Sequence, residues 1–161
     1  MGFFRSKKGS IISDYFKMLE PIGNFDAGNM YDVALYEDHL EITSPTIKGS
    51  ISLAYSKITD VFHGVQSELT EKKTSPIGRA IVGGALFGGI GAIVGAVSGS
   101  SGSKSVKTYK TLFIISYTDS SNNEAYLQFE DTRKYHGTKL AATLKNLCGI
   151  QDNPQSSNIE L

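Results

Sequence analysis

Charged residues are absent from one long stretch of this chain, and several residue types are scarce elsewhere. No Asp, Glu, Lys or Arg occurs between Ala80 and Ser103. Cys148 is the only cysteine, so no internal disulfide can form, which favours a reducing compartment. Lys plus Arg and Asp plus Glu both number 16, so the formal net charge is zero and indicates no general attraction to nucleic acid. The first residues, MGFFRSKKGS, contain no apolar core of signal-peptide length, and we therefore expect a cytoplasmic protein.

Sequence motifs for catalysis and for ligand binding are also missing. The three histidines, His39, His63 and His136, lack metal-ligand spacing, and Cys148 has no second thiol. The glycine runs GIGAIVG and GSSGSKS do not match the spacing and context of dinucleotide or phosphate loops. The sequence therefore predicts a protein that is not an enzyme and that has no catalytic residue, cofactor or metal site.

The chain does contain a regular series of glycines inside the uncharged stretch. On a helix these glycines step by four, three, four and four residues and lie on one face: Gly84, Gly88, Gly91, Gly95 and Gly99. Such a glycine zipper carries no Cβ bulk, so another backbone can approach it closely. We predict that this face serves helix packing and oligomerisation.

The other faces of the same segment are apolar, and its flanks are basic. Large apolar side chains offer a contact surface to a membrane or a partner: Leu86, Phe87, Ile90, Ile93 and Val94. Basic residues on both flanks are expected to face lipid headgroups: Lys72, Lys73, Arg79, Lys104 and Lys107. Because each interior glycine costs a helix about 1 kcal/mol relative to alanine, lipid, a partner helix or a protein groove must stabilise this segment.

Alternation of apolar and polar residues predicts β-strands on both sides of the glycine block. The expected strands span residues 31–36, 40–42, 47–53, 58–65, 109–118 and 125–129. Polar turn residues at 37–39 and the run DSSNN at 119–123 join the first two and the last two of these strands into hairpins.

A C-terminal amphipathic helix is predicted between Asp131 and Gly149. Leucines recur at helical spacing, at Leu140, Leu144 and Leu147. Asp131 or Thr132 is expected to cap the N-terminus, and Gly149 to end the helix in a left-handed conformation. Because Gly137 weakens the first turns, we expect the well-formed part to begin near Thr138.

Two stretches, ISLAYSKITDVFHGV and YKTLFIISYTDSSNNEAYLQFE with the helix after it, resemble the central strands and final hairpin of the bacterial PH-like and GRAM-like family. The resemblance spans Gly28 to Cys148 apart from the glycine block. It implies an α+β fold, a PH-like antiparallel β-barrel or sandwich with a C-terminal helix and an inserted glycine-rich helical hairpin. The chain then divides into an N-terminal segment (1–27), the PH-like domain (28–149) interrupted by the glycine-zipper hairpin (76–103), and a flexible tail (150–161).

The place of the insert constrains its topology. If the strands before Thr70 and after Tyr109 belong to one sheet, both ends of the insert return to the same side of any membrane, which excludes a single span. The uncharged residues would then fold back near Gly88–Gly91 into two arms of about 10 to 12 residues, or roughly 15 to 18 Å each as helix. Neither arm crosses a hydrocarbon core of about 30 Å. A re-entrant hairpin, an oligomeric assembly and a hairpin packed on protein all remain open.

These patterns predict a non-enzymatic PH-like module whose hairpin mediates membrane association, homo-oligomerisation, or both. The expected partners are copies of the chain and the anionic cytoplasmic face of a membrane. The alternative is a soluble adaptor or regulatory domain that binds a protein or peptide, with the hairpin packed internally.

Overall fold

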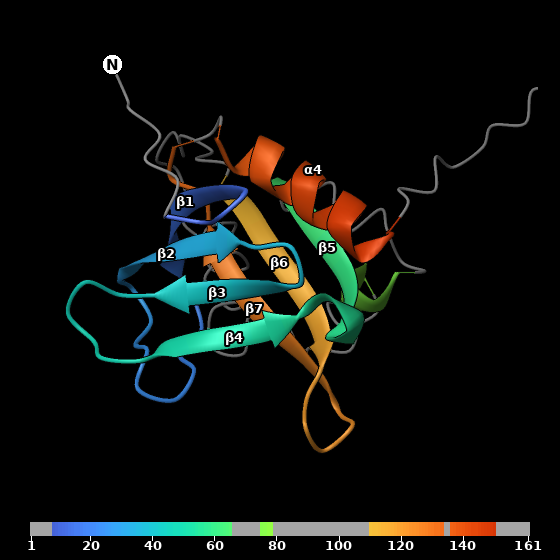
Figure 1. Ribbon diagram of the computed structural model, residues 1–161, viewed down its shortest axis with the longest axis horizontal. Coiled ribbons are helices and arrows are strands. Elements are labelled where there is room, and N and C mark those ends of the chain that lie inside the picture. Colours follow the sequence, from blue (N-terminus) through green and yellow to red (C-terminus); the bar gives the residue numbers. More distant parts are fainter. Residues whose placement is uncertain (1–7, 66–74, 79–109, 134–135, 151–161) are drawn as a thin grey trace, which may run out of the picture.

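The computed structural model describes residues 8–65, 75–78, 110–133 and 136–150, and these form a strongly curved antiparallel sheet with one long helix (Figure 1). The strands follow one another in the sheet in the order β4-β3-β2-β1-β7-β6-β5. The elements are β1 (Ile12–Met18), β2 (Met30–Leu35), β3 (His39–Thr43), β4 (Ser50–Ala54), the 3₁₀ helix η1 (Tyr55–Lys57), β5 (Ile58–Val65), β6 (Thr111–Thr118), β7 (Glu124–Glu130) and α4 (His136–Cys148).

Both predicted hairpins are confirmed. β2 and β3 pair antiparallel from Asp32–Thr43 to Leu35–Leu40, and β6 and β7 pair along their whole length. The turn between β6 and β7 is held by Asp119, whose Oδ1 accepts hydrogen bonds of 2.9 Å from the N–H groups of Ser121 and Asn123. These local side-chain bonds explain why a polar run between two apolar strands specifies a tight turn.

The strand β1 corrects the sequence prediction, which places no strand before residue 29. β1 lies in the middle of the sheet, paired with β2 on one side and with β7 at Lys17–Glu130 and Met18–Phe129 on the other. Phe16 and Met18 alternate with exposed or half-buried residues and point into the core. The N-terminal part of the chain therefore joins the two halves of the sheet.

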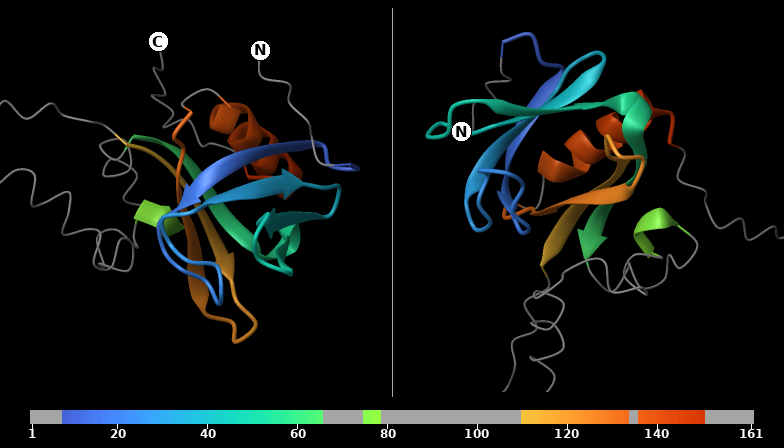
Figure 2. Two further views of the ribbon diagram at one scale, coloured as in Figure 1. Left: turned by 90° about the vertical axis from the view of Figure 1, so that its left-hand side faces the viewer. Right: turned by 90° about the horizontal axis from the view of Figure 1, so that it is seen from below.

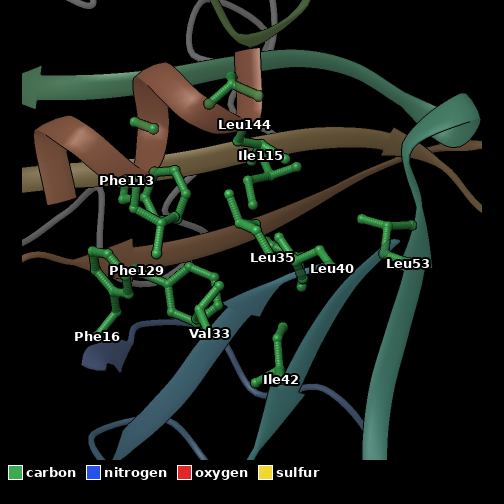
Figure 3. Packing of buried hydrophobic residues seen from close by; sticks show 14 of the residues in the cluster. Phe16, Val33, Leu35, Leu40, Ile42, Leu53, Phe113, Ile115, Phe129 and Leu144 are labelled. Carbon is green, nitrogen blue, oxygen red and sulfur yellow. The ribbon is translucent and has the colours of Figure 1, made fainter. Parts of the chain in front are cut away.

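The main core lies on the concave side of the sheet, where aromatic and branched side chains from all seven strands meet the apolar stripe of α4 (Figure 3). Phe16, Phe113 and Phe129 are fully buried, and their ring centroids lie 4.8 to 6.0 Å apart. From α4, Leu140, Ala141 and Leu144 complete this cluster. Burial of side chains of this size is worth about 1.5–3 kcal/mol each before the entropy cost is subtracted.

Helix α4 packs against β5 and β1, across the open end between the two halves of the sheet (Figure 2). It begins at His136, two residues before the position expected, and it is followed by Gly149 with a φ of 68°, as predicted. The predicted caps, Asp131 and Thr132, are wrong, because the helix begins several residues after them. Seven antiparallel strands and one terminal helix agree with a PH-like sandwich, whereas all of the predicted helical hairpin after residue 78 lies outside the described residues.

Candidate functional site

The ends of β5 and β6 define the root of the glycine-rich insert. These strands are neighbours and pair antiparallel, with Val65 opposite Thr111 at the end from which the insert departs. The chain therefore leaves the sheet and returns to it at adjacent strand ends. The same end carries the exit from β7, since the N–H of Asp131 donates to the carbonyl of Thr111 at 2.8 Å.

A short helical turn over residues 76–78 is the first described part of the insert. The hydroxyl of Ser75 accepts a hydrogen bond from the N–H of Gly78 at 3.0 Å, which is the N-cap arrangement. Pro76 follows at the first helical position, where its fixed φ suits the helix and its missing N–H costs nothing. The sequence Ser-Pro at this point therefore starts a helix at residue 76, the position at which the sequence analysis places the start of the insert.

Ile77 from this turn is completely buried on the convex side of the sheet. It packs there with side chains from β5, β6, β7 and the residue after β1, and together they form a second apolar cluster, here called the outer-face cluster: Leu19, Phe62, Ile77, Leu112, Ile114 and Tyr126. Figure 2 shows the turn at 76–78 on the side of β5 and β6 that faces away from α4. The insert is thus anchored to the domain at its first turn.

The convex surface of β5–β7 changes from apolar to polar along the strands. At the end near the insert, Ile114 pairs with Phe62, and Leu112 pairs with Gly64, which contributes no side chain. Toward the β6–β7 turn, the buried hydroxyl of Ser116 lies 2.8 Å from Thr59 Oγ1 and donates to Glu124 Oε1 at 3.3 Å. The apolar part of this surface is therefore confined to the end that carries Ile77.

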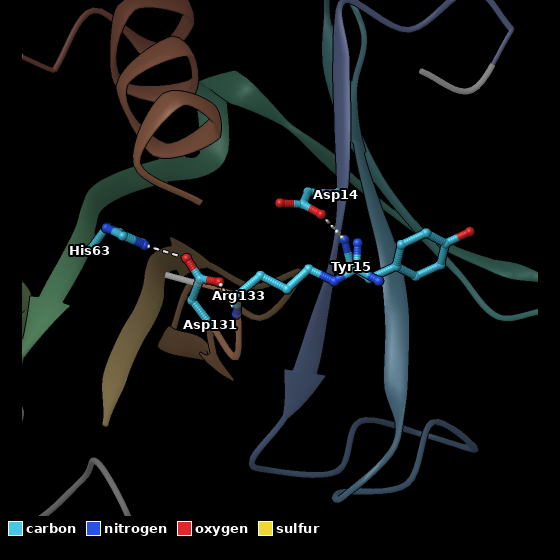
Figure 4. A network of polar contacts seen from close by, with 5 residues as sticks. All are labelled: Asp14, Tyr15, His63, Asp131 and Arg133. Atoms are coloured by element: carbon cyan, nitrogen blue, oxygen red, sulfur yellow. Dashed lines mark hydrogen bonds and ion pairs between the residues drawn. The ribbon is translucent and has the colours of Figure 1, made fainter. Parts of the chain in front are cut away.

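A buried polar contact links β5 to the residue that follows β7 (Figure 4). His63 Nε2 lies 2.8 Å from Asp131 Oδ2, and the side chains of the two residues are 9% and 0% exposed. Asp131 Oδ1 also accepts the N–H of Arg133 at 3.1 Å. A Cβ atom on Gly137 would collide with Asp131 Oδ2 and would lie 2.7 Å from His63 Nε2, so only glycine fits at this point of α4.

This His63–Asp131–Gly137 contact was missed by sequence reasoning, which treats the histidines as scattered and assigns Asp131 to a helix cap. His63 and Asp131 are 68 residues apart in the sequence, so no local motif predicts their contact. The one signal available is Gly137, a glycine early in a helix, which marks a close approach as well as a weak helical position. Its role in the structure is to bring α4 close to the end of β7.

Asp14 and Tyr15 of β1 lie beside this contact in Figure 4, together with Arg133. The guanidinium carbon of Arg133 lies 5.9 Å from the centre of the Tyr15 ring, close enough for a cation–π contact. Asp14 is 6% exposed; its Oδ1 accepts the N–H of Tyr15, while its Oδ2 has no hydrogen-bond partner. Within the described residues, no group of three or more His, Cys, Asp or Glu side chains is arranged to hold a metal ion.

Cys148 is half-buried at the end of α4, and burial raises the pKa of its thiol to about 11. The Cys148 thiol is therefore protonated near pH 7 and is a poor nucleophile. Burial also raises the pKa of Tyr55, whose hydroxyl donates to the carbonyl of Tyr36 and ties η1 to the β2–β3 turn.

The residues predicted from the sequence to form the functional site all lie outside the described residues. This applies to the zipper glycines Gly84, Gly88, Gly91, Gly95 and Gly99, to the apolar residues Leu86, Phe87, Ile90, Ile93 and Val94, and to the basic residues Lys72, Lys73, Arg79, Lys104 and Lys107. Their roles stay predictions. In the described part of the chain, no helix is long and apolar enough to cross a membrane.

Comparison with protein families gives a match that covers more than half of the chain. A family model described as a glycine zipper containing PH domain matches residues 22–131, from the loop before β2 to the end of β7. Searches of the curated proteins and of the solved structures gave no significant match. The matched span includes the strands β2 to β7 and the glycine-rich insert, whereas β1 and α4 lie outside it.

Proposed function

The chain belongs to the family of glycine-zipper-containing PH domains, and we propose that its β-domain is a non-enzymatic platform from which the zipper segment mediates homo-oligomerisation, membrane association, or both. The family match is consistent with a non-enzymatic module. In this proposal the domain positions the segment, and the segment makes the contact.

The observation that carries the proposal is the pairing of Val65 with Thr111. Because the strands that hold the insert are neighbours, the uncharged segment departs and returns at one end of the sheet. This supports a folded-back hairpin and argues against a helix that passes once through a membrane. A hairpin with two short arms reaches into a bilayer from one side or packs with copies of itself.

The chemistry of the segment supports contact with helices and with lipid. Glycines at helical spacing permit close backbone approach, which favours helix pairs even where lipid removes the hydrophobic drive. Basic residues lie on both sides of the uncharged stretch, with Lys72, Lys73 and Arg79 before it and Lys104 and Lys107 after it. An anionic membrane surface would therefore be met by the flanks of the insert.

Self-association is tested by adding bulk to the zipper face. The double variant Gly88→Leu/Gly95→Leu should lose oligomers in sedimentation velocity, measured with and without detergent, because leucine prevents close backbone approach. The matched control, Gly83→Leu/Ala96→Leu, places two leucines about 100° or more around the helix from the centre of the glycine face and should keep the oligomers. If the two variants sediment alike, the zipper face is not the self-association surface.

Membrane association is tested by flotation with vesicles of phosphatidylglycerol and phosphatidylcholine. The full chain should float with the vesicles, and a chain without residues 80–103 should not. The deletion spares Ile77 because this side chain completes the outer-face cluster. If both chains remain at the bottom of the gradient, the membrane part of the proposal is wrong.

One observation favours the second candidate, a soluble adaptor that binds a protein or peptide and keeps the hairpin packed on its own domain. Ile77 is fully buried against β5 and β6, so at least the first turn of the insert contacts the domain. An adaptor of this kind would sediment as a monomer with and without detergent. In the flotation experiment it would remain at the bottom of the gradient.

A further inference from the structure

We infer that the edge of β4 that faces away from β3 is a self-association surface, along which two copies of the chain pair as antiparallel strands about a two-fold axis at Ser52. The occupant of this edge is thus a second copy, and the two sheets become one continuous sheet. This surface is separate from the glycine zipper. The inference does not rest on the proposed function, because it concerns strands of the β-domain alone.

The first argument is the hydrogen-bonding pattern of β4. This strand ends the sheet and pairs with β3 alone among the described strands, so one side of its backbone is open (Figure 1). The N–H of Tyr55 donates to the carbonyl of Asp38 in this pair of strands. Since bonded and non-bonded positions alternate along antiparallel strands, Leu53 and Ile51 also direct their backbone groups toward β3. The backbone N–H and C=O groups that point away from the sheet belong to Ser50, Ser52 and Ala54.

The second argument is that β4 lacks the features that protect an edge strand from pairing. Such features include a charged side chain or a proline on the edge, a β-bulge and a covering helix. β5, at the opposite edge, has an irregular register between Ile58 and Asp60 and packs against α4. β4 contains no charged residue and no proline, and it pairs with β3 at five successive positions without a bulge. Its open edge is therefore competent to pair with a further strand.

A two-fold axis at Ser52 satisfies every outward backbone group of β4. Ser52 then lies opposite the partner's Ser52, and Ser50 lies opposite the partner's Ala54, so each outward N–H meets an outward carbonyl. The pleat brings Ile51, which is only partly buried, next to the partner's Leu53 on the core side of the sheet. Pairing therefore extends the main core across the interface as well as the sheet.

The third argument is charge, which favours a second copy as the occupant. In the loop 44–49 before β4, the one charged residue is Lys48, and it is exposed. The other end of β4 lies beside Glu37 and Asp38 of the β2–β3 turn, which are both exposed and outnumber Lys57 of η1. An antiparallel pair brings the basic end of each copy to the acidic end of the other. The edge is therefore complementary to itself.

The interface is small, so we expect a weak dimer. It consists of one five-residue strand from each copy, and small interfaces are typical of transient complexes. The dimer should be well populated at roughly 1 mM chain and sparsely populated at the roughly 10 μM used in sedimentation velocity. It therefore leaves the test of the zipper by sedimentation unaffected.

Amide hydrogen exchange in the full chain, followed by NMR, tests this pairing. The amides of Ser50, Ser52 and Ala54 should exchange about threefold more slowly at roughly 1 mM than at roughly 0.05 mM, because pairing places them in hydrogen bonds. The amide of Ile51 already bonds to β3 and should not change. Fast exchange at both concentrations overturns the inference. Slow exchange at both overturns it too, because a segment of the same chain then covers the edge.

Two substitutions at Ser52 provide matched variants for this measurement. Ser52→Lys places like charges opposite each other at the axis and should abolish the dependence on concentration, whereas Ser52→Thr is neutral and suits a strand, so it should keep it. An unchanged Leu53 amide in both variants shows that β4 still pairs with β3. Equal behaviour of the two variants overturns the inference.

The zipper variant Gly88→Leu/Gly95→Leu separates the β4 edge from the glycine zipper. Slower exchange of the Ser52 amide at high concentration should persist in this variant, because the zipper takes no part in the pairing. Its loss there would assign the protection to the zipper and overturn the inference.

Cysteine cross-linking tests the register and the identity of the occupant. In a chain with Cys148→Ser at roughly 1 mM, Ser52→Cys should form disulfide-linked dimers with copper phenanthroline about tenfold faster than Ser50→Cys. The two copies of Ser50 are offset by four residues, or about 13 Å, along the paired strands, whereas the two copies of Ser52 lie opposite each other. Equal rates for the two variants, or no dimer from Ser52→Cys, overturn the inference.

Discussion

His63 Nε2 and Asp131 Oδ2, 2.8 Å apart, join an edge strand to the residue that leads into the terminal helix. This contact lies at the end of the sheet where the insert departs, and it is buried. It fixes the exit of β7 against β5, so it contributes to the position of α4 over the main core.

Removing one partner of this pair should destabilise the domain. Asp131→Ala leaves the buried His63 ring without its carboxylate, and we expect a loss of about 2 kcal/mol in the free energy of unfolding measured in urea. His39 and Asp38 offer a matched pair at the surface. Nδ1 of His39 lies 2.6 Å from Oδ1 of Asp38, and the Asp38 side chain is 87% exposed. Asp38→Ala should leave the urea midpoint unchanged. Equal effects of the two substitutions would show that the buried contact contributes nothing specific.

Gly137→Ala should also destabilise the domain, although helix propensity alone predicts a gain of about 1 kcal/mol. The new Cβ would collide with Asp131 Oδ2, and we expect a net loss of about 2 kcal/mol, as for overpacked cores. In an Asp131→Ala background the penalty should shrink, which a double-mutant cycle measures. As a control for propensity, Ala142→Gly on the exposed side of α4 should cost about 1 kcal/mol. A more stable Gly137→Ala protein would contradict the close approach.

Local patterns predicted the hairpins and α4, because turn residues and apolar spacing act over a few positions. β1 was missed since one of its inward positions holds a carboxylate, Asp14, which breaks the apolar alternation between Ile12 and Phe16. The His63–Asp131 contact could not be predicted, because it depends on which strands become neighbours. For the candidate site, the sequence indicated the zipper glycines and their flanks, while the outer-face cluster required the pairing of β5 with β6 to be known.

The cap at Ser75 should control the stability of the helix at the root of the insert. Ser75→Ala removes the acceptor for the Gly78 N–H, and caps of this type are worth about 1 kcal/mol. We therefore expect the Gly78 amide to exchange its hydrogen about fivefold faster, as measured by NMR, with Ser75→Asp restoring the slow rate. Amides of β3 should be unaffected. If the Gly78 amide exchanges as fast in Ser75→Asp as in Ser75→Ala, capping by this side chain is ruled out.

Cys148 should make the stability of the domain fall in alkaline solution. Its pKa rises from 9.0 to about 11 through burial, so the unfolded chain loses the thiol proton at lower pH than the folded chain does. The stabilisation is fully present below about pH 9 and is lost as the pH rises toward 11, the folded value. Burial raises the pKa of Tyr55 as well, so its phenol adds to the decline at higher pH.

Cys148→Ser separates the two contributions, because it removes the thiol and keeps Tyr55. Urea unfolding at a series of pH values should show a shallower decline between pH 9 and 11 in this variant than in the parent chain. Alkylation provides a direct check: at pH 8 the native thiol should react with iodoacetamide roughly a hundredfold more slowly than the thiol of the urea-unfolded chain, because the thiolate fraction is lower by that factor. Equal rates in the native and unfolded chains would mean that the end of α4 does not bury Cys148 in solution.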